Sequence, residues 1–291
     1  MNIQKSFVTE SEGVLYVVPT PIGNLEDITF RALKILKSVA LIAAEDTRNT
    51  IKLLNHFDIQ TPLISYHEHN KLAREERLLQ ELMHGRSIAI VSDAGMPAIS
   101  DPGYEIVKAA INQEFPVIVL PGASAALCAL VGSGLSTNEF TFYGFLPRKR
   151  NDKIAELDRL KQYTGTIIFY ESPYRVKETL QILQREFGGD RRIAIARELT
   201  KKFEEYIRGT IDEVNQWMEE HDVKGECCLV VEGNQGDFAP DQPLWWSNLS
   251  VVDHVKHYME DEQKSSKEAI KLVAQERKMP KREVYQMYHV E

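Results

Sequence analysis

The sequence predicts an α/β fold in which two α/β domains are followed by a small helical module. Short apolar runs alternate with helical patterns from residue 14 onward, which is typical of βαβ units with a parallel sheet. The alternation starts again near Glu139, and after Gly233 only helical patterns remain. We therefore expect an N-terminal α/β domain over 1–138, a second over 139–238 and a helix-turn-helix-like module over 239–291.

The first domain is predicted to alternate buried strands with helices. The apolar runs that indicate strands lie at residues 14–18, 39–44, 62–65, 87–91 and 117–120. Helical spacing of apolar residues recurs at 30–37, 50–57, 72–84 and 104–113, and a further helix is expected after Pro121 and Gly122.

The second domain has the same character, with some antiparallel pairing expected. Its predicted strands lie at 140–145, 166–170, 192–197, 204–208 and 227–232, and its helices at 153–163, at 176–187 and around Trp217. Residues 236–243 indicate a linker. The tail predicts helices at 251–260, 267–277 and 281–288, with Ser265 and Glu268 as a cap of the second and Pro280 at the first position of the third.

Composition limits the class of protein. The 291 residues are 43% hydrophobic and 27% charged, which is ordinary for a globular protein, and no apolar run approaches the roughly 18 residues of a membrane span. The three cysteines, Cys128, Cys227 and Cys228, fit neither a disulfide framework nor a zinc site, so we expect a reducing cytosol. The net charge of −8 argues mildly against nucleic-acid binding, although a local basic patch would still hold RNA.

Polar, turn-rich segments follow the predicted strands. The loop 19–25 (PTPIGNL) carries two prolines and a glycine, and residues 44–48 (AEDTR) place two carboxylates and Arg48 after the next strand. In open α/β sheets ligands bind at the carboxyl ends of the strands. Each segment also has a purely structural interpretation, as a tight connection or as a surface ion pair, and Arg48 could instead grip an RNA phosphate.

Three further segments follow the same rule. Residues 66–70 (YHEHN) contain His-x-His, but two ligands do not make a metal site, so we expect no metal. The long loop 92–103 (SDAGMPAISDPG) sets two aspartates among glycines and prolines, where a backbone can approach a ligand closely. In residues 121–125 (PGASA), Ser124 is either a helix cap or a ligand-binding hydroxyl.

Taken together, these segments resemble the tetrapyrrole methylase superfamily, and within it the branch that methylates ribose on small-subunit ribosomal RNA. The resemblance covers about residues 14–233, and the helical tail is similar to that branch's C-terminal module. It rests on the strings VPTPIGNLEDITFRAL, AEDTR, SYHEHN, VSDAGMPAISDPG, VLPGASA, FYESPYR, ARELTKKFEE and GECCLVVEG.

The resemblance implies two α/β domains with S-adenosylmethionine bound in the cleft between them. Relatives that methylate corrin precursors carry Gly-Asp-Pro where this chain has Ser92-Asp93-Ala94, so the acid is kept and its neighbours differ. By similarity, the cofactor-binding candidates are Ile22, Ser92, Asp93, Ala94, Met96, Ser124, Ala125, Glu171 and Leu199. The resemblance further implies a homodimer acting on 16S ribosomal RNA in the 30S subunit.

The implied reaction is attack of a cytidine 2′-hydroxyl on the sulfonium methyl. The protein would mainly align the reacting atoms and exclude water, while a carboxylate or histidine accepts the hydroxyl proton. The sequence leaves the candidates for this base unranked: Glu45, Asp46, His67, Glu68 and Asp101.

RNA binding requires positive charge. We expect RNA contacts from Arg48, from the cluster Arg148, Lys149 and Arg150, and from Arg277, Lys278, Lys281 and Arg282 in the tail, although such runs are usually solvated surface. Tyr143, Tyr170 and Tyr174 are candidates for stacking an unpaired base, or are simply core or cleft-wall aromatics. Two alternatives remain: a methyltransferase for a tetrapyrrole or protein substrate, and a non-catalytic RNA-binding protein on the same fold.

Overall fold

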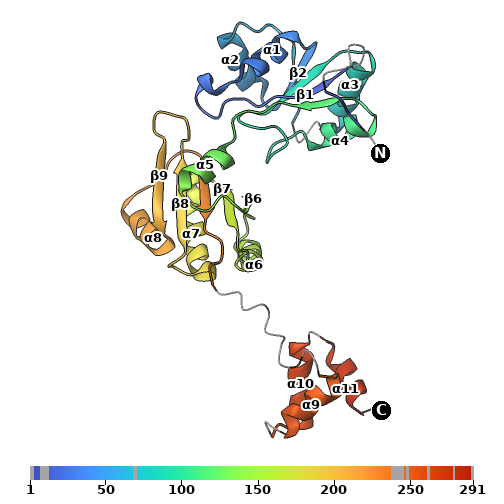
Figure 1. Cartoon of the computed structure of the whole chain (residues 1–291), viewed down its shortest axis with the longest axis vertical. Coiled ribbons are helices and arrows are strands. Elements are labelled where there is room, and N and C mark those ends of the chain that lie inside the picture. The colour runs from blue at the N-terminus through green and yellow to red at the C-terminus, as the bar shows by residue number, and fades with distance from the viewer. Residues whose placement is uncertain are drawn as a thin grey trace. The chain divides into compact units, whose positions relative to one another are not determined.

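The computed structural model describes residues 3–6, 13–67, 71–236, 246, 249–260, 263–277 and 279–289. The chain forms two compact units, Met1–Asn234 and Gln235–Glu291. The larger unit contains two sheets, each with its own helices, which we call the first and second lobe (Figure 1). No helix within the described ranges is long and apolar enough to cross a membrane. Most of the predicted linker, from residue 237, lies outside the described residues.

The first lobe is built on a five-stranded sheet in the order β3-β2-β4-β1-β5. All four neighbouring pairs are parallel, as the alternating pattern predicts. The strands are β1 (Leu15–Val17), β2 (Leu41–Ala44), β3 (Leu63–Ser65), β4 (Ile88–Val91) and β5 (Val117–Val119). The helices are α1 (Phe30–Ser38), α2 (Thr47–His56), α3 (Lys71–Met83) and α4 (Tyr104–Asn112), and a short 3-10 helix, η1 (Leu25–Asp27), follows β1.

Helices cover both faces of this sheet because successive strand residues point to opposite sides. Val18, Ile42 and Ala89 pack with α1 and α2 on one face. Val17 and Ile88 pack with α3 and α4 on the other. The strands are therefore apolar without interruption, as is usual for a parallel sheet that is buried on both faces.

The second lobe is a mixed sheet in the order β6-β7-β10-β8-β9. Only β6 and β7 pair in parallel, and the other three pairs are antiparallel, so the expected antiparallel pairing is confirmed. The strands are β6 (Phe140–Phe145), β7 (Thr166–Glu171), β8 (Arg192–Arg197), β9 (Glu205–Thr210) and β10 (Cys227–Val231). The helices α6 (Arg150–Leu160), α7 (Pro173–Phe187) and α8 (Ile211–Glu220) contribute to the core on one face.

The opposite face of the second sheet is covered by α5 (Ala125–Ser133), which follows the last strand of the first lobe. Ala126, Ala129 and Leu130 of α5 are buried against Ile168 and Ala194 of the sheet. Arg208 of β9 also donates from Nε to the carbonyl of Gly132 at 2.9 Å. The helix follows the first lobe in the chain but packs as part of the second lobe.

The smaller unit contains α9 (Val251–Glu260), α10 (Ser266–Glu276) and α11 (Lys281–His289), which share one apolar core (Figure 1). The predicted cap of α10 is confirmed, because Ser265 and Glu268 form a complete capping box. Pro280 lies one position before α11 rather than inside it, and its carbonyl accepts from the Glu283 amide at 2.9 Å. The predicted helical module is therefore present.

Candidate active site

One pocket of about 430 Å³ is lined by residues from both lobes. The lining comprises Ile22, Glu45, Asp93, Ala94, Gly95, Met96, Ile99, Ser100, Asp101, Ser124, Ala125, Phe145, Tyr170, Glu171, Ser172, Pro173, Ala196, Leu199, Glu226, Cys227 and Cys228. Its size falls in the range of small-molecule sites, and it combines apolar walls with a few polar groups, as such sites usually do.

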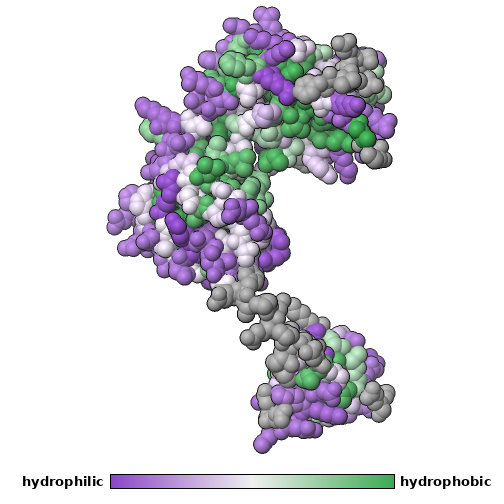
Figure 2. Space-filling model, in the orientation of Figure 1, coloured by the Kyte–Doolittle hydropathy of each residue, from purple (hydrophilic) through white to green (hydrophobic). Residues whose placement is uncertain are grey.

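The connections after β1, β2, β4 and β5 all reach this pocket. The carboxyl ends of parallel strands meet at one edge of a sheet, so the loops that follow them lie side by side. Ile22, Glu45, Asp93 and Ser124 each represent one of these connections among the lining residues. Figure 2 shows apolar surface, in green, on the side of the first lobe that faces the second.

The loop 92–103 is fixed to the loop after β1. The backbones of Thr20 and Gly95 exchange two hydrogen bonds of 3.0 Å, and the Thr20 hydroxyl donates to the Ser92 carbonyl at 3.1 Å. The buried Ser92 hydroxyl lies 3.3 Å from the carbonyls of Ala94 and Gly95. Ser92 is the only predicted cofactor residue absent from the lining, and the structure uses its side chain to shape the loop.

Two residues of this loop have a left-handed backbone that side chains other than glycine disfavour. Ala98 has φ +68° and Ser100 has φ +63°. Across the pocket, Glu198 and Thr200, which flank Leu199, have φ +50° and +65°. Such conformations cost free energy and concentrate where a loop geometry is imposed for function.

Asp93 joins two connections of the first lobe. One carboxylate oxygen accepts from the Asp46 amide and the other from the Asn49 amide nitrogen, both at 3.0 Å. The Asp93 amide itself faces a carboxylate oxygen of Glu45 at 3.4 Å. Asp93 therefore sets the position of the start of α2 as well as lining the pocket.

Two acidic side chains of the pocket, Asp101 and Glu45, have raised pKa values. Burial, reinforced by the negative charges of Glu45, Asp93 and Glu226, raises the pKa of Asp101 to about 7. Burial, together with Asp93 and Asp46, also raises the pKa of Glu45. A carboxyl group whose pKa lies near neutrality is suited to exchange a proton at physiological pH.

The second-lobe wall rests on a buried ionic network. Glu171 has no exposed side chain; it accepts from the Thr179 hydroxyl at 2.7 Å and from the Ser172 amide at 2.9 Å. Lys153, fully buried, donates to the same Thr179 hydroxyl at 3.0 Å and lies 4.0 Å from Glu171. Arg175 lies 3.5 Å from the other oxygen of Glu171. This network holds the junction of β7 and α7 in place.

The loop after β1 also touches the second lobe directly. The Asn24 amide donates to the Thr200 hydroxyl at 3.1 Å. A Cβ on Gly23 would collide with the Lys201 side chain and lie 2.8 Å from the Thr200 hydroxyl oxygen. Only glycine permits this approach, which brings Leu199 and Ile22 to the same pocket.

The predicted residues divide clearly by location. Of the cofactor candidates, all except Ser92 line the pocket, namely Ile22, Asp93, Ala94, Met96, Ser124, Ala125, Glu171 and Leu199. Ser124 precedes α5, but its side chain makes no capping hydrogen bond, so the structure does not use the hydroxyl as a helix cap. Of the base candidates, Glu45 and Asp101 line the pocket.

The other base candidates lie elsewhere. Asp46 caps α2 by accepting from the Arg48 amide at 2.9 Å, and it pairs with the Arg48 guanidinium at 2.6 Å. Hydrogen bonds from Arg48 lower the pKa of Asp46 to about 2. This cap starts α2 three residues earlier than predicted. His67 is half-buried and outside the pocket lining, and Glu68 lies outside the described residues.

The predicted basic residues show two kinds of environment. Arg148, Lys149 and Arg150 are exposed before and at the start of α6, and Lys281 and Arg282 are exposed on α11. Lys278 lies outside the described residues.

Arg277 instead organises the helical unit. It donates to the carbonyls of Trp246 at 3.1 Å and Leu249 at 2.6 Å, and to the ring of His254 at 3.1 Å. Its guanidinium also stacks over the Trp246 ring at 4.9 Å. The structure therefore gives this arginine a structural role.

Several lining residues were not assigned from the sequence, among them Phe145, Glu226, Cys227 and Cys228. The antiparallel β10 begins where β7 and β8 end, since Cys227 pairs with Glu171 and with Arg197. Its first residues therefore reach the same edge as the carboxyl ends of its neighbours. The string GECC marks these residues in the sequence, but only the antiparallel direction of β10 shows that they reach the pocket. Within the described part of the chain, no three His, Cys, Asp or Glu side chains gather as a metal site.

Solved structures define the class of the fold. The larger unit resembles a cobalt precorrin-4 methyltransferase, with a TM-score of 0.58 at 15% identity over 75% of this chain and 94% of that one. It also resembles uroporphyrin-III C-methyltransferase from Thermus thermophilus complexed with S-adenosyl homocysteine, with a TM-score of 0.55 at 16% identity over 76% and 97%. These likenesses establish the two-lobed methylase architecture.

The family itself follows from the sequence comparison. The chain belongs to the Tetrapyrrole (Corrin/Porphyrin) Methylases, whose family model matches residues 14–215. It is 53% identical to ribosomal RNA small subunit methyltransferase I of Halalkalibacterium halodurans over 100% of both chains. It is 54% identical to the protein of the same name from Bacillus subtilis, over 99% of this chain and 98% of that one.

Proposed function

We propose that this protein is an S-adenosylmethionine-dependent methyltransferase of small-subunit ribosomal RNA. One observation carries the proposal: four turn-rich connections, in a chain half identical to such enzymes along its whole length, converge on a single pocket. We propose further that the acceptor is the 2′-hydroxyl of a cytidine in the decoding region of 16S RNA, and that the acceptor is presented by the 30S subunit to a cytoplasmic homodimer.

The residues present fit the methyl donor. Apolar side chains of Ile22, Met96 and Leu199 offer a surface for a purine, and Ser124 leaves its hydroxyl uncommitted to the helix it precedes. The acids Glu45 and Asp101 complement a cationic sulfonium by charge. We propose that these residues, with Asp93, Ala94, Ala125 and Glu171, hold the donor, and that Ser92 contributes by shaping their loop. When bound, the donor supplies a methyl group already activated by positive sulfur.

The chain's own groups would then orient the acceptor and remove its proton. Asp101 is the candidate base that best combines location and chemistry, since it lines the pocket and its pKa is about 7. Asp46 and Arg48 are paired with each other, and Glu45 bonds the Asp93 amide, which leaves Asp101 the freer carboxylate. Exclusion of water by the apolar walls favours displacement over side reactions.

Positive surface for the RNA is present beside the pocket and on the helical unit. Arg148, Lys149 and Arg150 are exposed close to the lining residue Phe145, and Lys281 and Arg282 are exposed on α11. Phosphate contacts of this kind supply affinity without sequence readout. They explain how a chain with a net charge of −8 would hold RNA. We propose that the chain divides functionally into 1–138, 139–238 and 239–291.

Methyl transfer from labelled donor to purified 30S subunits tests the proposal. We expect label in the RNA, mapped by mass spectrometry to one ribose-methylated cytidine. Corrin precursors serve as the competing substrate, and label in them instead would support the tetrapyrrole alternative. Absence of both donor binding in calorimetry and transfer would support the non-catalytic RNA-binding protein.

A further inference from the structure

An exposed aromatic ring follows the pocket-lining start of α7. Tyr174 is 96% exposed, although it follows directly on Ser172 and Pro173, which line the pocket. Phe145, itself a lining residue, is 56% exposed. Exposed aromatic rings at and next to a pocket lining are suited to contact a ligand, so we take these two as the starting point.

The structure distinguishes Tyr174 from the other tyrosines considered from the sequence. Tyr143 packs on the second-lobe core, with its ring 5.6 Å from that of Phe169. Tyr170 is held between Phe142, at 4.9 Å, and Phe145, at 5.6 Å, and burial raises its pKa to about 12. Both rings belong to walls of the protein, whereas the ring of Tyr174 faces solvent.

Buried contacts fix the backbone that presents these rings. Arg175 donates to the carbonyls of Leu146 at 3.3 Å and Pro147 at 2.9 Å, which ties the end of β6 to the start of α7. The same Arg175 is paired with Glu171, which is bonded to Thr179. The aromatic surface is therefore preorganised, and binding would cost little ordering of the backbone.

The charge beside the rings is positive. Arg148, Lys149 and Arg150 follow the two carbonyls that Arg175 holds, and Lys177 is exposed one helical turn from Tyr174. Two acids of α6 and α7 lie near this positive charge. Glu178 of α7 accepts a hydrogen bond from Lys153 at 3.3 Å, which partly neutralises it, and Asp152 of α6 is exposed as an opposing charge. Aromatic rings among cations are the surface that binds single-stranded nucleic acid.

We propose that Tyr174 and Phe145, flanked by residues 148–150 and Lys177, form a stacking platform that holds an unpaired nucleotide of the substrate RNA at the pocket mouth. This inference rests on the proposed function and names the RNA contact of that site. In this proposal the base stacks on the exposed ring of Tyr174. Phe145, which lines the pocket, continues the apolar surface from Tyr174 into the pocket, and the basic side chains bind the neighbouring phosphates.

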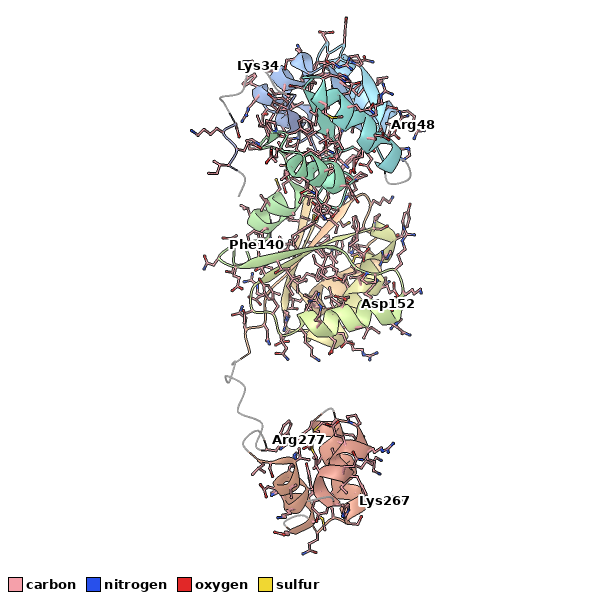
Figure 3. All side chains as sticks on the ribbon, turned by 90° about the vertical axis from the view of Figure 1, so that its right-hand side faces the viewer. Lys34, Arg48, Phe140, Asp152, Lys267 and Arg277 are labelled. Atoms are coloured by element: carbon pink, nitrogen blue, oxygen red, sulfur yellow. The ribbon has the colours of Figure 1, made fainter. Side chains whose placement is uncertain are left out.

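Tyr174→Ala, Tyr174→Phe and the matched control Phe140→Ala test the platform in the full-length protein. Phe140 is also an exposed ring, and it lies at the start of β6, whereas Phe145 lies at the end of that strand. Figure 3 shows Phe140 on the opposite side of the lobe from Asp152 of α6, the helix that begins at Arg150 of the basic cluster, so Phe140 is away from the proposed platform. We expect Tyr174→Ala to raise the KM for 30S subunits about tenfold. Tyr174→Phe and Phe140→Ala should stay near wild type, and calorimetric affinity for S-adenosylhomocysteine should be unchanged in all three.

Direct binding of a single-stranded RNA oligonucleotide that carries 2-aminopurine separates this inference from the proposed function. Stacking on Tyr174 should quench the fluorophore in wild type and in Tyr174→Phe, but not in Tyr174→Ala. If wild type methylates 30S subunits and Tyr174→Ala has the same KM and the same quenching, the platform is refuted while the proposed function stands. If Tyr174→Ala impairs 30S binding but the free oligonucleotide is never quenched, the surface contacts a ribosomal protein and the inference is overturned. If wild type methylates no ribosomal RNA, the proposed function fails, and quenching still decides whether Tyr174 stacks a base.

Discussion

Replacing Asp101 by asparagine removes the carboxyl group that we propose as the proton acceptor, while keeping its size. With a pKa of about 7, the side chain is roughly one-tenth ionised at pH 6 and nine-tenths ionised at pH 8. Because only the ionised form accepts a proton, we expect the wild-type rate to rise about tenfold between these values. Asp101→Asn should lose this rise and retain at most about one-hundredth of the rate at pH 8.

The charges around Asp101 provide a second, directional test. Glu226 contributes to the raised pKa of Asp101, after burial and the charges of Glu45 and Asp93. Glu226→Gln removes one negative charge, so the pKa of Asp101 should fall. The rise of the methyl-transfer rate with pH, which we call the rising limb, should then move to lower pH. The exposed Asp158→Asn serves as the control and should leave the limb in place.

The assay is single-turnover transfer of labelled methyl to 30S subunits at saturating enzyme, since slow product release would otherwise hide the chemical step. Donor affinity, measured by calorimetry at both pH values, separates binding from chemistry. A rate that is flat from pH 6 to pH 8 in wild type, or a full limb that persists in Asp101→Asn, would refute the assignment of the base.

Three further substitutions test the supporting structure. Asp93→Ala releases the hydrogen bonds to Asp46 and Asn49, so calorimetry should show donor binding about tenfold weaker; unchanged affinity would contradict the role of this loop. Lys153→Met leaves Glu171 and Glu178 without their buried partner, and urea unfolding should show a loss of about 3 kcal/mol, whereas the exposed Lys149→Met should show almost none. Arg277→Lys cannot make the hydrogen bonds that the guanidinium makes to Trp246, Leu249 and His254 at once. Amide hydrogen exchange in α9 and α10 should therefore accelerate by the equivalent of about 2 kcal/mol. Equal protection in the variant and the wild type would show that these hydrogen bonds do not stabilise the helical unit.

Regular elements were predictable from the sequence because their signals are local. The apolar runs and helical spacing placed the strands and helices of both lobes to within a few residues. The errors at helix starts have local causes too: Asp46 caps α2, and Pro173 takes the first turn of α7, three residues before the apolar pattern begins. The boundaries at 138 and 238 stay a prediction.

The site was predictable as far as it consists of loops after parallel strands. Ile22, Asp93 and Ser124 each follow a parallel strand of the first lobe. Because the carboxyl ends of parallel strands meet at one edge of the sheet, these residues lie on the same edge. Glu226 and Cys227 were not assigned because β10 runs the other way, and only strand direction places its start at the pocket. Pairing such as that of Asp46 with Arg48 depends on side-chain geometry that spacing alone does not determine.

The position of α5 has a consequence for how the larger unit is assembled and divided. A chain cut after residue 138 would leave its first part with a helix whose apolar side has no cover, and its second part with Ile168, Ala194 and Val230 exposed to water. Neither piece would be an independent building block, and exchange of one lobe between relatives would have to carry this helix along.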